Sequence, residues 1–169
     1  MSSYREVFNL KLKHTMIFFL SLLLFACSNE IEPKEHLGEI YIVALDTIME
    51  LDEALSHDIE YIAIDSERFK DVDDNEKEEI LNYFRKKYDV EIIYANLEQL
   101  QDLGRYNPDT LVLDGVLLKI ENVNIKLNNS VLFEGFKYRA GDGAIGVEAE
   151  IEYKDNKWQT TDITIPWIS

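Results

Sequence analysis

The sequence predicts an α+β fold, and a change of pattern along the chain supports this prediction. In the first half apolar residues recur at intervals of three and four, which is typical of amphipathic helices. In the second half apolar and polar residues alternate, which is typical of antiparallel strands with one face in water. We therefore expect a single α+β domain over residues 39–169, in which an N-terminal helix and a β-α-β unit precede a four-stranded antiparallel meander.

The predicted N-terminal helix begins near Gly38. Tyr41, Leu45 and Ile48 belong to its apolar stripe, which is long enough for a helix of about four turns. The polar run at residues 56–58 then ends the helix.

A strand, a helix and a second strand follow. Residues 59–65 and 90–95 are short runs rich in residues that favour strands, and the segment between them has a helical pattern. Asp73 is the expected N-cap of this helix, because Glu76 then falls at the capping-box position. The short connections imply a right-handed crossover, and hence a parallel pair of strands.

The second half begins with a short helix that Asn96 and Gln99 cap and Gly104 ends. After this helix the apolar period changes to two. The apolar phase of the first long strand shifts near Glu121-Asn122, which predicts a β-bulge there. The four expected strands are residues 116–127, 130–139, 145–153 and 158–168.

The segment at residues 141–146 matches the letters of a dinucleotide-binding fingerprint. That motif needs a helix directly after its glycines. An alternating strand follows here, so the pattern argues against nucleotide binding. We expect Gly141 and Gly143 to supply positive φ values for a hairpin turn, and Gly146 to mark a twist.

The leading segment predicts where the protein resides. Met16 to Ala26 is an apolar run of eleven residues, preceded by Arg5, Lys11 and Lys13. A membrane-spanning helix needs about 20 residues, whereas this length and these flanks are typical of a signal peptide. We therefore assign residues 1–26 to a signal peptide and residues 27–38 to a polar tether.

Leu24-Phe25-Ala26-Cys27 resembles the lipobox of bacterial lipoproteins. The resemblance implies cleavage before Cys27, and attachment of acyl chains to Cys27 that hold the protein on the extracytoplasmic side of the cell membrane. Phe25 is bulkier than the usual residue at its place. The alternatives are a secretory signal with a coincidental cysteine, or a buried core helix; the charged flanks disfavour the latter.

Charge narrows the range of partners. The whole chain carries a net charge of −16, with 33 acidic and 17 basic side chains. This balance excludes nucleic acid, which requires a basic stripe, and it permits a peptide or protein partner of basic character. The chain has one cysteine, so no disulfide within the chain is expected.

Carboxylates are abundant and no pair of them stands out, but candidate ligand-binding residues lie in the second half of the chain. Glu148 and Glu150 share one face of a predicted strand, and with Trp158 they would suit a groove for a cationic ligand. Such an acidic row is more often a solvated sheet face, which also discourages pairing at the sheet edge.

Other candidate chemistry is weaker. Asp71, Asp73 and Asn75 match the start of a calcium loop, but Glu76 replaces its required glycine, and helix capping explains the same acids. We expect no catalytic residue, no metal site and no cofactor.

Several blocks of the sequence resemble a family of small lipoproteins from Gram-positive bacteria. These blocks are YIVALDTIMELDEAL, YIAIDSERFKDVDDNEKEEILNYF, YNPDTLVLDGVLLKIENV and YRAGDGAIGVEAEIEYKDNKWQTTDITIPWIS. Some members are labelled as substrate-binding proteins of peptide transporters. The leading hypothesis is a non-enzymatic, lipid-anchored domain that binds a ligand or partner. The alternatives are an accessory peptide-binding component of an ABC transporter and a hydrolase that uses carboxylates alone.

Overall fold

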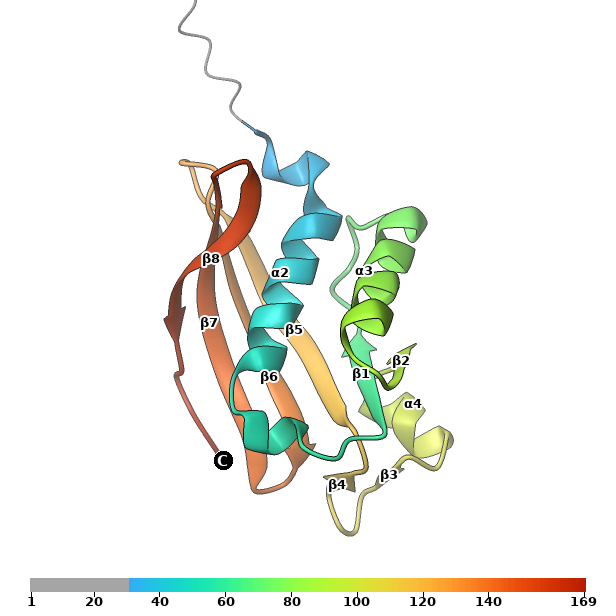
Figure 1. Cartoon of the computed structure of the whole chain (residues 1–169). Helices are drawn as coiled ribbons and strands as arrows, with labels where there is room; N and C mark the ends of the chain where they lie inside the picture. The colour runs from blue at the N-terminus through green and yellow to red at the C-terminus, as the bar shows by residue number, and fades with distance from the viewer. Residues whose placement is uncertain (1–30) are drawn as a thin grey trace, which may run out of the picture. The chain divides into compact units, whose positions relative to one another are not determined.

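A six-stranded mixed β-sheet organises residues 31–169, which are the residues described by the computed structural model (Figure 1). The predicted signal peptide, Leu24, Phe25, Ala26 and the proposed attachment point Cys27 lie outside these residues. The described part of the chain is one α+β domain, as the sequence predicted. Its helices are α2 (Leu37–Glu50), α3 (Asp74–Lys87) and α4 (Leu97–Asp102), with short 3-10 helices η1 (Pro33–Glu35) and η2 (Glu53–Ser56).

The strands follow one another across the sheet in the order β2 (Glu91–Tyr94), β1 (Tyr61–Asp65), β5 (Val116–Ile125), β6 (Val131–Ala140), β7 (Gly143–Lys154) and β8 (Lys157–Thr164). β1 lies parallel to both β2 and β5, and the pairs β5–β6, β6–β7 and β7–β8 are antiparallel. The parallel β1–β2 pair around α3 agrees with the predicted crossover unit. Two short strands, β3 (Tyr106–Asn107) and β4 (Val112–Leu113), form a separate small pair.

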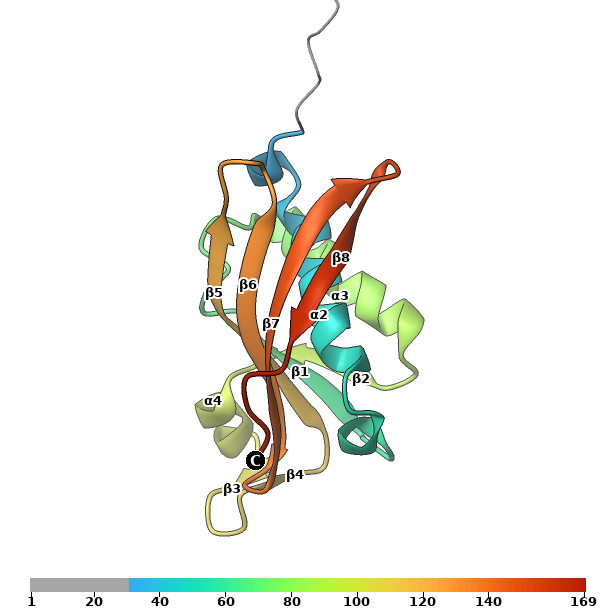
Figure 2. The same ribbon diagram turned by 90° about the vertical axis from the view of Figure 1, so that its left-hand side faces the viewer.

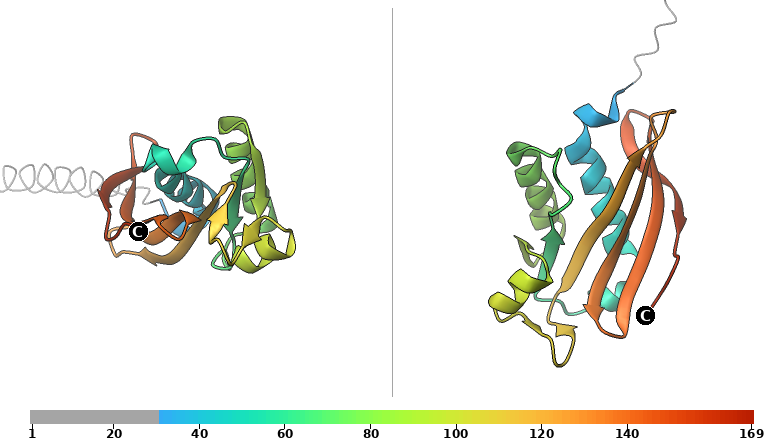
Figure 3. Two further views of the ribbon diagram at one scale, coloured as in Figure 1. Left: turned by 90° about the horizontal axis from the view of Figure 1, so that it is seen from below. Right: turned by 180° about the vertical axis from the view of Figure 1, so that it is seen from behind.

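Helices cover the two faces of the sheet unequally. α2 contacts all four strands from β5 to β8 and packs beside α3; Figure 3 shows the sheet curving around it. The main core lies on this face and includes Ile62 and Ile64 of β1. Tyr61 and Ala63 point to the opposite face, where Leu100 of α4 covers them in a second, smaller core. On that opposite face none of the helices within residues 31–169 lies over β6, β7 and β8 (Figure 2).

Local capping sets where the helices begin. Asp73 Oδ1 accepts hydrogen bonds from the backbone N–H groups of Asn75 (2.8 Å) and Glu76 (2.9 Å), and Glu76 Oε2 accepts one from Asp73 N–H (2.8 Å). Asn96 and Gln99 form the same reciprocal arrangement at α4. Both predicted capping pairs are thus confirmed, and each satisfies backbone donors that a helix N-terminus leaves open.

The folded region begins earlier in the chain than the expected tether boundary. α2 starts at Leu37, and both Leu37 and Gly38 are buried, as is Pro33 in the preceding 3-10 turn. The physical reason is a contact with α3: Glu76 Oε1 accepts a hydrogen bond from the Gly38 N–H at 3.0 Å. Residues 33–38 therefore belong to the fold.

The glycines at the β6–β7 turn act differently from the expectation. Among residues 31–169, Gly104 is the only glycine with a positive φ, so the prediction for Gly141 and Gly143 is wrong. Close packing explains two of the glycines instead. A Cβ on Gly141 would lie 3.0 Å from Leu111 Cδ1, and one on Gly146 would lie 2.3 Å from Trp167 Nε1. Gly146 thus makes room for an indole ring against β7.

Candidate functional site

The structure does not bring the three sequence-predicted ligand residues together. Glu148 and Glu150 lie on the face of β7 opposite to α2. Trp158 pairs with Tyr153 across the β7–β8 turn and is buried in the main core, where its ring lies 6.2 Å from that of His36. A groove lined by all three residues is therefore not present.

Glu150 is engaged within the sheet. Its carboxylate accepts a hydrogen bond from Lys126 Nζ at 2.8 Å and another from the Ser130 hydroxyl. These two donors hold the pKa of Glu150 below its ordinary value. The contacts fasten the β5–β6 turn to β7, which is a structural role for this side chain.

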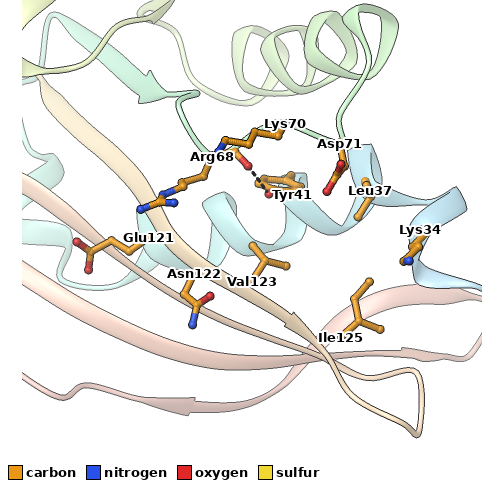
Figure 4. Close-up of a pocket in the computed structure, with 10 residues that line it drawn as sticks. All are labelled: Lys34, Leu37, Tyr41, Arg68, Lys70, Asp71, Glu121, Asn122, Val123 and Ile125. Carbon is orange, nitrogen blue, oxygen red and sulfur yellow. Dashed lines mark hydrogen bonds between the residues drawn. The ribbon is translucent and has the colours of Figure 1, made fainter.

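A different candidate site lies where β5 extends beyond the end of its neighbour β1. A cavity of about 460 Å³ lies between the start of α2, the loop that joins β1 to α3, and the second half of β5 (Figure 4). We call it the α2–β5 cleft. Its lining residues are Lys34, Leu37, Tyr41, Arg68, Lys70, Asp71, Glu121, Asn122, Val123 and Ile125.

The chain topology explains why a cleft forms there. β1 pairs with β2 on one side and with β5 on the other, and the connections through α3 and α4 pass over opposite faces of the sheet. The carboxyl end of β1 is thus a topological switch point, which is where open α/β sheets usually bind ligands. β1 stops at Asp65, opposite Lys119, while β5 continues to Ile125. The space that a longer β1 would fill remains open.

One wall of the cleft is held in place by buried aromatic packing. Tyr41 of α2 is 6% exposed, and its hydroxyl donates to the backbone oxygen of Arg68 at 3.2 Å. Its ring meets that of Phe69 edge-on, with 4.4 Å between the centroids. Burial, and to a lesser extent the charge of Asp71, raises the pKa of Tyr41 to about 12. The loop carrying Arg68 is therefore fixed to α2 without any ligand.

The charges of the cleft differ from those of the chain as a whole. Three cationic side chains line it, namely Lys34, Arg68 and Lys70, against the two carboxylates of Asp71 and Glu121. Arg68 extends in the direction of Glu121 (Figure 4). Within residues 31–169, none of these three cations forms an ion pair.

Cations elsewhere in the domain are mostly engaged, and the best example joins α2 to α3. Asp46 accepts hydrogen bonds from the Tyr83 hydroxyl (2.8 Å), the Tyr88 hydroxyl (2.9 Å) and Lys87 Nζ (2.6 Å). Lys87 also lies 2.6 Å from Glu50. Burial first, and then the bond to Asp46, raises the pKa of Tyr88. This network fixes two helices to each other and leaves none of its donors for a ligand.

Lys137 is a buried cation that the sequence pattern did not reveal. Its side chain is fully buried under the end of α2, and Nζ donates to the backbone oxygens of Met49 (3.0 Å), Leu51 and Asp52 (2.9 Å) and to Ser56 Oγ (2.9 Å). A cation at a helix C-terminus complements the helix dipole. Burial nevertheless lowers the pKa of Lys137 to about 8.

No group of three or more His, Cys, Asp or Glu side chains within residues 31–169 is arranged to hold a metal ion. None of the helices described between these residues is both long and apolar enough to cross a membrane.

Comparisons of the chain with protein-family models, with curated proteins and with solved structures found no match. The resemblance to small lipoproteins therefore stays a prediction from the sequence.

Proposed function

We propose that this chain is a lipid-anchored extracytoplasmic protein whose domain binds an anionic ligand in the α2–β5 cleft. The apolar run at residues 16–26 followed by Cys27 supports the anchor. The binding site is supported by one observation above all: three cations that form no ion pair within residues 31–169 line a single cleft, in a chain with a net charge of −16.

The form of the cleft suits a ligand with both anionic and apolar parts. Leu37, Val123 and Ile125 contribute apolar surface, and the cations stand at the rim. A volume of about 460 Å³ lies within the range of roughly 300–1,000 Å³ that small-ligand sites occupy. A carboxylate is the simplest group that satisfies Arg68, because a guanidinium can donate two parallel hydrogen bonds to it.

The overall negative charge does not prevent such binding. At physiological ionic strength the Debye length is about 8 Å, so exposed acids farther away are largely screened. The charges nearest to the cleft then determine its electrostatic attraction for a ligand, and these are three positive and two negative side chains. The sequence-based expectation of a basic partner depends on total charge and applies to the remaining surface.

Fluorescence anisotropy with a labelled tetraglutamate peptide, and with a labelled tetralysine peptide for comparison, tests the cleft. Replacing Lys34, Arg68 and Lys70 together with glutamine should weaken tetraglutamate binding at least tenfold. The matched control replaces Lys86 and Lys157, which are exposed, form no ion pair within residues 31–169 and lie outside the cleft. Equal loss in both variants, or preference for tetralysine at the cleft, contradicts the proposed ligand chemistry.

The anchor has a separate test. Cells that express the chain are grown with labelled palmitate, alongside cells that express the Cys27→Ala variant. Incorporation should occur in the wild type and disappear in the variant, because the variant lacks the Cys27 sulfur, the proposed attachment atom. Label that persists without Cys27, or that never appears in the wild type, refutes the lipoprotein assignment.

A further inference from the structure

One edge of β5 is unpaired along the α2–β5 cleft. The pairing of β1 with β5 ends at Asp65 and Lys119, whereas β6 continues to pair with β5 up to Ile125. Within residues 31–169 no strand pairs with the stretch Glu121–Ile125 on the side away from β6. The same stretch supplies four of the residues that line the cleft.

The hydrogen-bond pattern shows which backbone groups face the cleft. The N–H of Lys126 donates to the oxygen of Ser130 at 2.8 Å, and the oxygen of Lys126 accepts from the N–H of Asn129 at 3.0 Å, so both backbone groups of Lys126 point toward β6 and its turn. This direction alternates from residue to residue along a strand of an antiparallel ladder. Asn124 is therefore bonded to β6, while the N–H and C=O groups of Val123 and Ile125 point the other way. Neither residue has another backbone partner among the described residues.

Unpaired strand edges are templates for pairing with a further strand, and proteins use them to bind extended peptides. β2 and β8 also have free edges, because they are the outer strands of the sheet. The edge of β5 differs from both because it lies inside a cleft whose three cations form no ion pair with any described residue. The unpaired backbone edge of β5 and the three cationic side chains thus lie in the same cleft.

We propose that the cleft binds an extended peptide with an acidic side chain, which adds as a strand beside Val123–Ile125 in continuation of the line of β1. This inference rests on the proposed function and names its ligand class. The peptide forms up to four backbone hydrogen bonds with Val123 and Ile125. Its alternate side chains lie toward Leu37, and Arg68, Lys70 or Lys34 holds its carboxylate.

Hydrogen exchange in the full-length protein in detergent tests the backbone contact. The probe is a blocked six-residue peptide that alternates threonine and valine and ends in glutamate. Its addition should slow amide exchange at Val123 and Ile125. The amide of Asn124 serves as an internal reference, because it already bonds to β6 and should not change.

N-methylation of the same probe supplies a test that leaves the protein unaltered. Methylating one alternate set of peptide nitrogens should weaken binding about fivefold for each lost hydrogen bond. Methylating the other set should leave the dissociation constant within about twofold. A matched peptide ending in lysine should bind at least tenfold more weakly than the glutamate peptide.

The outcomes separate this inference from the proposed function. One outcome would be that tetraglutamate and the probe bind through the three cations, while the two methylated peptides bind equally well and amide exchange at Val123 does not slow. In that case strand addition is wrong, and the proposed anion-binding site is retained. If the lysine peptide binds as well as the glutamate peptide, the acidic specificity is wrong. If neither the probe nor tetraglutamate changes exchange or binding at the cleft, both proposals fail.

Discussion

Lys137 should make the stability of the domain depend on pH between neutrality and pH 10. Its pKa is about 8 in the folded protein, against 10.5 for an ordinary lysine. Between these two values the unfolded chain binds more protons than the folded chain. The stability contribution of Lys137 is therefore lowest below pH 8, and it rises as the pH increases toward 10.5.

The magnitude follows from the two pKa values. Linkage between pH 7 and pH 10 gives the wild type a gain of about 2.5 kcal/mol in unfolding free energy from this one amine. A Lys137→Met variant has a stem of similar length but no titrating group, so it should lack this gain. Tyrosines with raised pKa values affect wild type and variant alike, and therefore cancel in the difference.

Urea unfolding followed by tryptophan fluorescence measures this difference, since Trp158 is buried in the main core. Three proteins that lack residues 1–27 are compared: the wild type, Lys137→Met and the exposed control Lys157→Met. A urea unfolding curve is recorded for each at several pH values from 7 to 10. The difference between wild type and Lys137→Met should grow by about 2.5 kcal/mol over this range. Parallel stability curves would show that the amine is not desolvated in the folded state, and would refute the reasoning.

Three further substitutions test other contacts by the same unfolding assay. Asp73→Ala should cost about 1–2 kcal/mol, because it removes the N-cap of α3; an effect near zero contradicts that role. Asp46→Ala should cost about 2–3 kcal/mol by leaving two tyrosine hydroxyls unpaired, whereas Glu50→Ala, at a side chain 62% exposed, should cost under about 0.5 kcal/mol. Equal costs would argue against the Asp46 network. Gly146→Ala should cost about 1–3 kcal/mol by displacing the indole of Trp167, and much less in a Trp167→Ala background; equal costs in both backgrounds would exclude that contact.

Features that depend on residues close in sequence could be predicted. The capping pairs of α3 and α4 join residues three apart, and both are as expected. The register shift between Ile120 and Asn122 likewise lies where the apolar phase changes. In each case the physical cause is contained in one short segment, so the pattern of that segment is sufficient.

The position of Trp158 could also have been predicted. The two-residue turn Asp155-Asn156 sets Trp158 opposite Tyr153, and Tyr153 alternates with Glu152 along the strand. Trp158 therefore had to lie on the face away from Glu150. The candidate site joined these residues by proximity in the sequence without applying this alternation.

The contacts of Lys137 and the α2–β5 cleft could not be predicted in the same way. Lys137 bonds to backbone oxygens more than eighty residues earlier in the chain. The cleft exists because β1 ends before β5 does, and this matters only once the two strands are known to be neighbours. No periodicity within either segment contains that information.

The bulge in β5 has a consequence for insertions and deletions during evolution. Ile120 pairs with Gly135 and Asn122 pairs with the next residue, Glu134, so Glu121 is the extra residue. A chain that lost this single codon would keep every pair and every side chain on its present face, but β5 would lose the bend that a bulge imposes. Loss of Glu121 would therefore straighten β5 and remove one carboxylate from the lining of the α2–β5 cleft, while the register of the sheet stayed intact.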